Sequence, residues 1–182
     1  MKQQVNDTLE MNNAYGKESG KIADAFLTKE GAEFDSAIQS IEFQFDQVAD
    51  EAREGLAWIK KYKDGEISFD KLREEIVDAF TDIQVFALPI PAFVGCDPIV
   101  HFDETMTANM SKLCKTISQV EVTQAYYDDS LSVETYYERI GDYYAVKSLK
   151  DQTGSDGKSY PQHKVLKNTE WIEPNHIQHF DA

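Results

Sequence analysis

Apolar residues recur every three or four positions between residues 35 and 62, and this pattern predicts a long amphipathic helix. Asp35 suits its N-cap, and Gly65 suits a left-handed C-cap. A second apolar stripe runs from Ser68 toward Pro89, where proline must end the helix. Only four residues link the two helices, which predicts an antiparallel pair. The expected buried positions are Ile38, Ile41, Phe45, Val48, Ala52, Ile59 and Tyr62 in the first helix, and Leu72, Ile76, Ala79, Phe80, Ile83 and Phe86 in the second.

The pattern changes twice in the second half of the chain. Asp97 and Pro98 predict the start of a third helix, with Asp as N-cap and Pro at the first helical position. A shorter helix is expected over 118–127. From residue 135 the period becomes two, with 135–139 and 143–147 on either side of a Gly-Asp turn, which predicts a β-hairpin. The expected core face of the third helix is Ile99, Phe102, Met106, Met110, Leu113 and Ile117.

These elements predict a mainly all-α protein, an antiparallel helix bundle with a small C-terminal β-hairpin. With 182 residues the chain is long enough for one domain with a sizeable core. Residues 1–19 are polar and are interpreted as a flexible arm, and 20–132 as the helical core. Residues 133–182 are expected to form the hairpin and a lysine-containing tail within the same domain.

Composition and charge narrow the classes of partner. The net charge is −15, so duplex nucleic acid and anionic membrane surfaces are not expected partners. Cys96 and Cys114 are too few for a disulfide framework, and the chain shows neither a long apolar run nor a signal peptide. We therefore expect a soluble protein of the cytoplasm, or of the host cytoplasm if it is encoded by a phage.

Two pairs of carboxylates lie on the two long helices. Glu51 and Glu54 are three residues apart on the first, and Glu75 and Asp78 are three apart on the second. Residues three apart share one face of a helix, so two packed helices would bring four carboxylates together. Uncompensated negative charge is unfavourable there, and a hard cation such as Mg²⁺ would balance it.

Acidic pairs at this spacing also have a simpler interpretation. A chain with 33 Asp and Glu contains several such pairs by chance, and most of them form a solvated helix face. The occurrence of two pairs on consecutive, antiparallel helices favours a metal site over that alternative.

The spacing also resembles the ExxE and ExxD signature of the all-α nucleotide pyrophosphohydrolases, the MazG-like superfamily, which includes dimeric dUTPases and phosphoribosyl-ATP pyrophosphohydrolases. Asp50 stands where many relatives have the first Glu of EExxE. Later segments resemble the phage-type branch: His101, Asn109-Met110-Ser111-Lys112-Leu113, Gly157-Lys158, Lys164-Val165-Leu166-Lys167, Trp171 and Pro174.

The resemblance implies a Mg²⁺-dependent hydrolase, with Mn²⁺ as a substitute metal, whose metal ligands and catalytic residues are Glu51, Glu54, Glu75 and Asp78. Water would attack the α-phosphorus of a nucleoside triphosphate and release a monophosphate and pyrophosphate. The resemblance also implies a homodimer or homotetramer with its site near the subunit interface.

Further residues are candidates for binding the substrate. Asn109 and Lys112 share a helix face and match the family motif. Residues 143–169 carry five Lys against two Asp, and Lys164 and Lys167 there could bind outer phosphates, although solvated surface lysines are the simpler reading of any one of them. Base recognition is expected from side chains on the carboxylate face, namely Trp58 for stacking and Gln44 or Gln47 for hydrogen bonds.

A second class of function stays open. An acidic helical protein could bind nucleotides without turnover, or could mimic the charge of a nucleic acid. Within the enzyme class, a modified or signalling nucleotide is an alternative substrate. Metal-dependent pyrophosphate release from a panel of nucleotides separates these possibilities.

Overall fold

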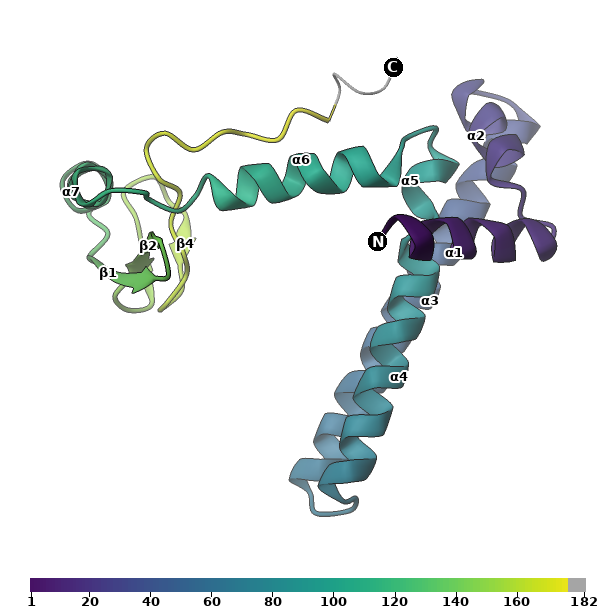
Figure 1. Ribbon diagram of the computed structural model, residues 1–182, viewed down its shortest axis with the longest axis horizontal. Helices are drawn as coiled ribbons and strands as arrows, with labels where there is room; N and C mark the ends of the chain where they lie inside the picture. The colour runs from purple at the N-terminus through teal and green to yellow at the C-terminus, as the bar shows by residue number, and fades with distance from the viewer. Residues whose placement is uncertain (177–182) are drawn as a thin grey trace. The chain divides into compact units, whose positions relative to one another are not determined.

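The computed structural model describes residues 1–176, and the described chain is mainly helical with a small antiparallel β-hairpin (Figure 1). This confirms the mainly helical class. The residues form two compact units, one from Met1 to His101 and one that begins at Phe102. The helices are α1 (Lys2–Ala14), α2 (Ser19–Leu27), α3 (Ala32–Lys63), α4 (Phe69–Ala87), α5 (Ile90–Phe93), α6 (Pro98–Met110), α7 (Ile117–Ala125) and the π-helical turn η1 (Tyr126–Ser130).

The division between the units differs from the expected grouping of residues 20–132. It falls inside α6, where Ala108 is the one buried residue of the helix. A helix that buries so little side-chain surface adds little packing to either unit. The end of the expected tail, residues 177–182, lies outside the described residues.

The first residues form helix α1, whereas their polar composition suggested a flexible arm. Val5, Thr8 and Asn12 are buried along it. The Asn12 side-chain amide donates to the Thr8 carbonyl at 2.9 Å, and its oxygen accepts a hydrogen bond from Gln44 of α3 at 3.3 Å. The packed face is largely polar, so no apolar stripe marks the helix in the sequence.

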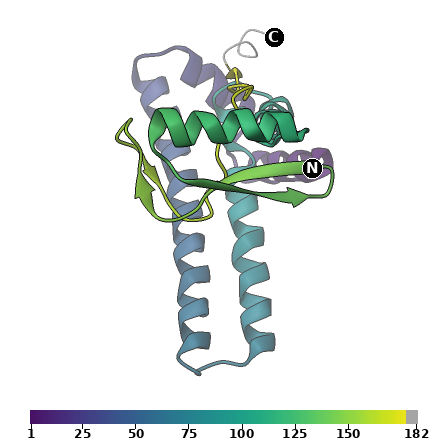
Figure 2. The same cartoon turned by 90° about the vertical axis from the view of Figure 1, so that its left-hand side faces the viewer.

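The two long helices α3 and α4 form the predicted antiparallel hairpin and lie side by side in both views (Figures 1 and 2). Gly65 has a φ of +77°, which lets the chain leave α3 in the left-handed region. The Ser68 hydroxyl caps α4 by accepting a hydrogen bond from the Lys71 backbone N–H at 3.2 Å. Both predicted ends of this hairpin turn are therefore confirmed.

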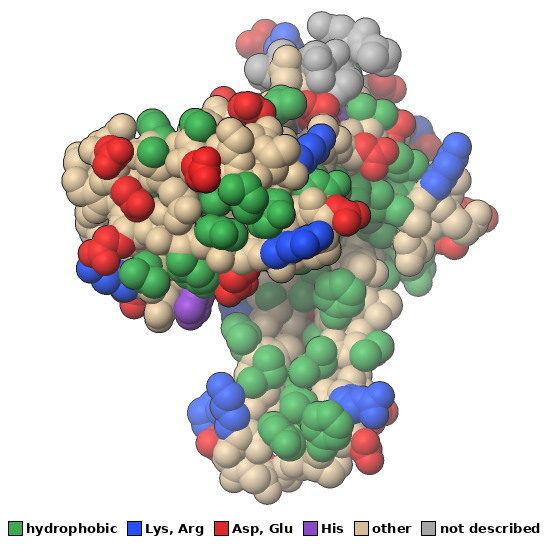
Figure 3. Space-filling view, turned by 60° about the vertical axis from the view of Figure 1, so that its left-hand side comes forward, with side chains coloured by type: hydrophobic (Ala, Val, Ile, Leu, Met, Phe, Trp, Pro, Cys, Tyr) green, Lys and Arg blue, Asp and Glu red, His purple; other side chains and the backbone are tan. Residues whose placement is uncertain are grey.

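The apolar stripe of the hairpin is less buried than predicted. In α3 only Ala37 and Gln44 are buried, and in α4 only Leu72 and Ala79. Five residues expected in the core, Phe45, Ala52, Tyr62, Ile76 and Phe80, are exposed, and Figure 3 shows apolar side chains gathered on the hairpin surface. The stripe is wider than the single contact between two helices can cover.

One stretch of the described chain, Phe69–Phe93, is long and apolar enough to cross a membrane by length and composition. No such stretch was expected from the sequence. It arises because the apolar positions of α4 continue into α5. A single stretch of this kind is weak evidence for a membrane span, since the core helix of a soluble protein can pass the same test.

The second unit is built around the β-hairpin of β1 (Thr135–Ile140) and β2 (Tyr143–Ser148), which confirms the predicted strands and turn. Two short strands, β3 (Gln152–Thr153) and β4 (Ser159–Tyr160), pair separately. One apolar cluster packs α7 and η1 against the hairpin and the following chain. It consists of Cys114, Val120, Tyr127, Val133, Val146, Tyr160 and Leu166.

The third helix is shorter than its apolar pattern suggested. Helix α6 starts as predicted, with the Asp97 carboxylate accepting a hydrogen bond from the Ile99 N–H at 2.8 Å. It ends at Met110, and Cys114 instead pairs with Tyr144 of β2 through backbone hydrogen bonds of 2.8 Å in both directions. The apolar periodicity in the sequence continues to Ile117, but the helix ends earlier because the chain pairs with the sheet.

Candidate functional site: a carboxylate face and a lysine-lined cavity

Carboxylates from both long helices meet on one face of the α3–α4 hairpin. The pKa of Glu51 is raised, first by desolvation of its carboxyl group and then by the negative charges of Asp82, Glu54 and Asp78, with Asp50 a smaller contribution. A charge acts on a neighbouring pKa in this way only at short range. Glu51 therefore lies among carboxylates of its own helix and of α4.

Close packing of the α3 and α4 backbones determines which carboxylates lie at the same height along the two helices. A Cβ atom on Gly55 would lie 3.5 Å from the Cβ of Ala79, so α3 and α4 approach closely there. Glu51 is one turn before Gly55, and Asp82 is one turn after Ala79. In an antiparallel pair these two turns lie side by side, which explains why Asp82 acts on Glu51 more strongly than Asp78 does.

Glu75 lies on α4 one turn closer to the hairpin loop than Asp78 does, beside a cation. Its carboxylate forms an ion pair with Lys71, four residues earlier on α4. The Lys71 ammonium also lies 6.0 Å from the centre of the Trp58 ring, and the Trp58 Nε1–H donates to Glu54 at 3.2 Å. Trp58 thus connects Glu54 on α3 with Lys71 on α4, on the face where the sequence analysis placed it.

The four predicted metal ligands are consequently staggered along the hairpin. Glu54 and Asp78 each lie within electrostatic reach of Glu51, whereas the Glu75 charge is balanced by Lys71. Within residues 1–176, no three His, Cys, Asp or Glu side chains are close enough to hold a metal ion as they stand. The donor chemistry suits Mg²⁺, because carboxylate oxygens are its preferred protein ligands, and the exposed Glu54 and Asp78 side chains can turn toward a cation.

The two glutamines predicted for base recognition differ in burial. Gln44 is 1% exposed; its amide nitrogen donates to Asn12, and its Oε1 has no hydrogen-bond partner in the structure. Gln47, one turn closer to Glu51, is half-buried. A buried unpaired amide oxygen is unfavourable and can accept a hydrogen bond from a ligand, so the role predicted for Gln44 stays a prediction.

The remaining predicted residues lie in the second unit and come together there. The Lys112 ammonium donates to the Asn109 side-chain oxygen at 2.7 Å, as their shared spacing predicted. Lys112, Lys164 and Lys167 all line one cavity of about 730 Å³. That volume lies within the usual range for small-molecule sites, roughly 300–1,000 Å³.

Two charged residues of the hairpin face were missed by the sequence reasoning. Asp82 follows Asp78 by four positions, so the helical spacing contained the signal. Lys71 precedes Glu75 by four positions on the same face. Both lie four residues from a predicted ligand, whereas the predicted carboxylate pairs were three residues apart.

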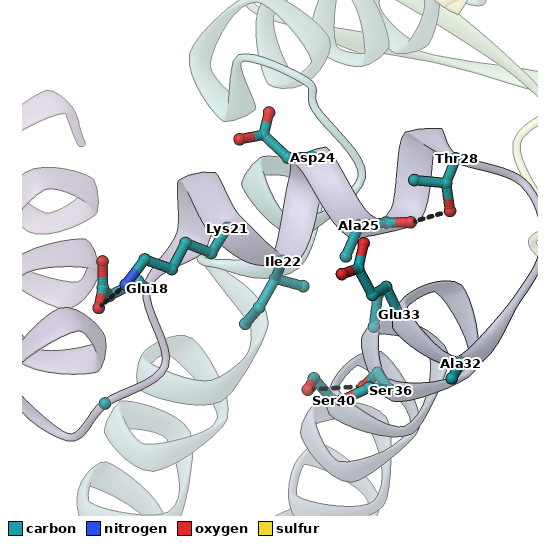
Figure 4. A pocket seen from close by; sticks show the side chains of 12 residues that line it. Glu18, Lys21, Ile22, Asp24, Ala25, Thr28, Ala32, Glu33, Ser36 and Ser40 are labelled. Atoms are coloured by element: carbon teal, nitrogen blue, oxygen red, sulfur yellow. Dashed lines mark hydrogen bonds and ion pairs between the residues drawn. The ribbon is translucent and has the colours of Figure 1, made fainter.

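The first unit also contains a cavity, of about 700 Å³, which lies between α2 and α3 (Figure 4). Its lining includes Glu18, Asp24 and Glu33, and its one lysine, Lys21, is paired with Glu18 at 2.6 Å. Figure 4 shows Asp24 pointing away from α3. This acid-rich lining does not suit a phosphate-bearing ligand.

The chain was compared with protein-family models, with curated proteins and with solved structures, and none of them gives a significant match.

Proposed function

We propose that this protein is a Mg²⁺-dependent nucleotide pyrophosphohydrolase that splits a nucleoside triphosphate into the monophosphate and pyrophosphate. The observation that carries the proposal is the gathering of carboxylates around Glu51, with Glu54 on the same helix and Asp78 and Asp82 on α4, at the place where α3 and α4 approach closely. Carboxylates gathered without a counter-cation disfavour one another, and cation binding relieves this. The spacing of Glu51, Glu54, Glu75 and Asp78 also resembles that of the MazG-like superfamily.

The metal would be held by Glu51, Glu54 and Asp78, with Asp82 as an added ligand and Glu75 released from Lys71. When bound, Mg²⁺ would neutralise the polyphosphate and lower the pKa of a coordinated water. A carboxylate of this face that the metal leaves free would hold the attacking water or accept its proton.

Other residues of this face would orient the substrate. Trp58 is half-buried, and its indole is held by Glu54 and by Lys61, whose ammonium lies 3.7 Å from the ring centre. A ring fixed in this way offers a stacking surface for a base. Lys71, once displaced from Glu75, would be free to approach a substrate phosphate.

A second copy of the chain would complete the site. Glu75 and Asp78 border a hollow of about 540 Å³ that is lined by α4 residues alone. Phe45, Leu56, Val77 and Phe80 on the two helices are more than half exposed. An apolar face of this kind on a helical hairpin is commonly covered by a symmetric partner. We accordingly propose a homo-oligomer, a dimer or tetramer, that buries this face.

Nucleotide sequestration without turnover is the second candidate. The observation in its favour is the lysine-lined cavity of the second unit, because it contains none of the carboxylates needed for metal-dependent hydrolysis. A protein that used this cavity alone would bind nucleotides and release them unchanged.

Pyrophosphate release from a panel of ribo- and deoxynucleoside triphosphates, with product identification, tests the proposal. Turnover should require Mg²⁺ and should fall by several orders of magnitude in Glu51→Gln. Asp46→Asn is the matched control, since Asp46 is an exposed carboxylate of α3 that does not act on Glu51. Tight nucleotide binding with no turnover of any nucleotide would favour sequestration.

A further inference from the structure

The lysine-lined cavity of the second unit gathers side chains from separate parts of the chain. Lys112 follows α6, Lys158 lies in the loop between β3 and β4, and Lys164 and Lys167 lie in the segment after β4. Four lysines and a single carboxylate, Asp156, line this cavity in a chain whose net charge is −15. Folding has therefore concentrated positive charge at this one place, against the average of the sequence.

Most of this charge has no acidic partner. Lys158 pairs with Asp156 at 3.2 Å, and the Asp156 carboxylate also accepts hydrogen bonds from the Lys158 backbone N–H at 3.1 Å and from the Tyr160 hydroxyl at 2.9 Å. Within residues 1–176, no ion pair joins Lys112, Lys164 or Lys167 to a carboxylate. Three ammonium groups around one cavity repel each other, and an anionic ligand would offset that repulsion.

The neutral partners of these lysines leave their charges available. The Lys112 ammonium donates to the Asn109 amide oxygen at 2.7 Å, and that of Lys164 donates to the Ser159 carbonyl at 3.2 Å. The Lys167 ammonium lies 3.2 Å from the centre of the Trp171 ring. Each of these contacts orients an ammonium group without neutralising it.

Aromatic rings share the wall of the cavity with the lysines. The Trp171 indole is half-buried and fixed by a hydrogen bond of 3.0 Å from its Nε1–H to the Ala108 carbonyl. Tyr126 is 46% exposed and packs edge-to-face on the buried Tyr127, with ring centres 5.2 Å apart. Held rings beside positive charge suit a ligand with a planar base and phosphates.

We propose that this cavity is a nucleotide-binding site in its own right, in which Lys112, Lys164 and Lys167 bind the phosphates and Trp171 stacks on the base. It binds a nucleoside triphosphate without a metal ion, because lysine supplies the positive charge. The choice of a nucleotide over other phosphorylated aromatic ligands rests on the proposed function, but the binding event itself does not require hydrolysis.

Fluorescence titration in the presence of EDTA tests this site. The chain has two tryptophans, so a Trp58→Phe background leaves Trp171 as the only indole reporter. ATP, adenosine and inorganic tripolyphosphate are the probes. ATP should quench Trp171 saturably, tripolyphosphate should compete with it, and adenosine should bind more weakly than either.

Variants separate the contributions of charge and ring. Lys112→Ala and Lys167→Ala should each weaken ATP binding on the order of tenfold, because a charged hydrogen bond is lost. Lys115→Ala is the matched control, since Lys115 is exposed in the same unit but does not line this cavity. By calorimetry, Trp171→Leu should abolish the preference for ATP over tripolyphosphate, and Trp171→Phe should retain most of it.

Several results would overturn the inference. One is the absence of saturable quenching by ATP at millimolar concentration. Another is a loss of ATP affinity in Lys115→Ala equal to that in Lys112→Ala and Lys167→Ala. A third is a strong preference for a single-stranded oligonucleotide over ATP, which would indicate a nucleic-acid surface. Circular dichroism establishes that each variant is folded. The wild-type protein assayed with Mg²⁺ for pyrophosphate release reports on the hairpin separately, so ATP binding without turnover would contradict the proposed hydrolysis and leave this site standing.

Discussion

Glu51 on α3 lies level with Asp82 on α4, and after desolvation the charge of Asp82 is the largest influence that raises the Glu51 pKa. The contact of Gly55 with Ala79 one turn away brings the two helices close enough for this effect. The opposing carboxylate that raises the Glu51 pKa most is therefore a residue outside the four that the acidic spacing singled out.

Glu51→Gln should stabilise the metal-free protein at neutral pH. A carboxyl group whose folded-state pKa is raised stabilises the fold at pH values below its unfolded-state pKa, near 4.5, and this contribution is lost as the pH rises through the folded-state value. The wild type should therefore lose stability across that window and the variant should not. Urea unfolding in EDTA from pH 4 to pH 8 measures the difference. Equal stability of the two proteins at pH 7 would contradict the electrostatic argument.

Glu75→Gln should abolish metal-dependent turnover if Glu75 joins the metal ligands. The crowding of four carboxylates suggested from sequence that this change would leave the fold as stable or more stable. The ion pair with Lys71 now predicts a small loss of stability instead, because Gln cannot replace the charge. Pyrophosphate release at saturating Mg²⁺ and thermal unfolding measure the two effects. Glu74→Gln is the control, since the exposed Glu74 also pairs with Lys71. Turnover of Glu75→Gln near the wild-type rate would show that Glu75 is not a metal ligand.

Lys112→Ala should weaken the binding of triphosphates in the second-unit cavity more than that of nucleotides with fewer phosphates, because an ammonium charge beside Asn109 is lost. Stability should fall by no more than about 0.5 kcal/mol, as for most substitutions outside the core. Lys112→Arg should rescue only in part, since a planar guanidinium does not replace a compact ammonium. A nucleotide affinity in EDTA that is indistinguishable from wild type would place Lys112 outside the binding site of this cavity.

Gly55→Ala should raise the free energy of unfolding by up to about 1 kcal/mol, the difference in helix propensity between the two residues. The added Cβ would lie at an ordinary contact distance of 3.5 Å from Ala79. Gly55→Leu should instead force the helices apart, lower stability and return the Glu51 pKa toward its usual value. Chemical denaturation and carboxyl titration by NMR check these outcomes. A stable Leu variant with an unchanged Glu51 pKa would show that the helices do not meet at Gly55.

Phe80→Glu should convert the proposed homo-oligomer to a monomer, because a charge would be buried on the apolar face of the hairpin. Sedimentation velocity at micromolar concentration measures the change. Val122→Glu is the matched control, since Val122 is a 55% exposed apolar residue on α7, outside the hairpin. A wild-type protein that sediments as a monomer would contradict the oligomer proposal directly.

The sequence by itself determined the elements whose signals are local. Gly65, Ser68 and the Asp97-Pro98 pair mark helix ends through their own backbone preferences, and the Gly-Asp turn sets the register of the β-hairpin. These effects act over a few residues, so neighbouring residues in the sequence are sufficient to predict them. The spacing of Asn109 and Lys112 likewise predicted their contact.

Only the tertiary structure decided which distant groups meet. The close approach at Gly55 sets the level of α3 against α4, and it places Asp82 beside Glu51 while Glu75 pairs with Lys71. Helix α1 was missed because it packs through polar residues such as Asn12, and α6 ends early because Cys114 pairs with β2. Helical period fixes the face on which a side chain lies, but the register between elements depends on which surfaces pack best, and that is a property of the folded chain.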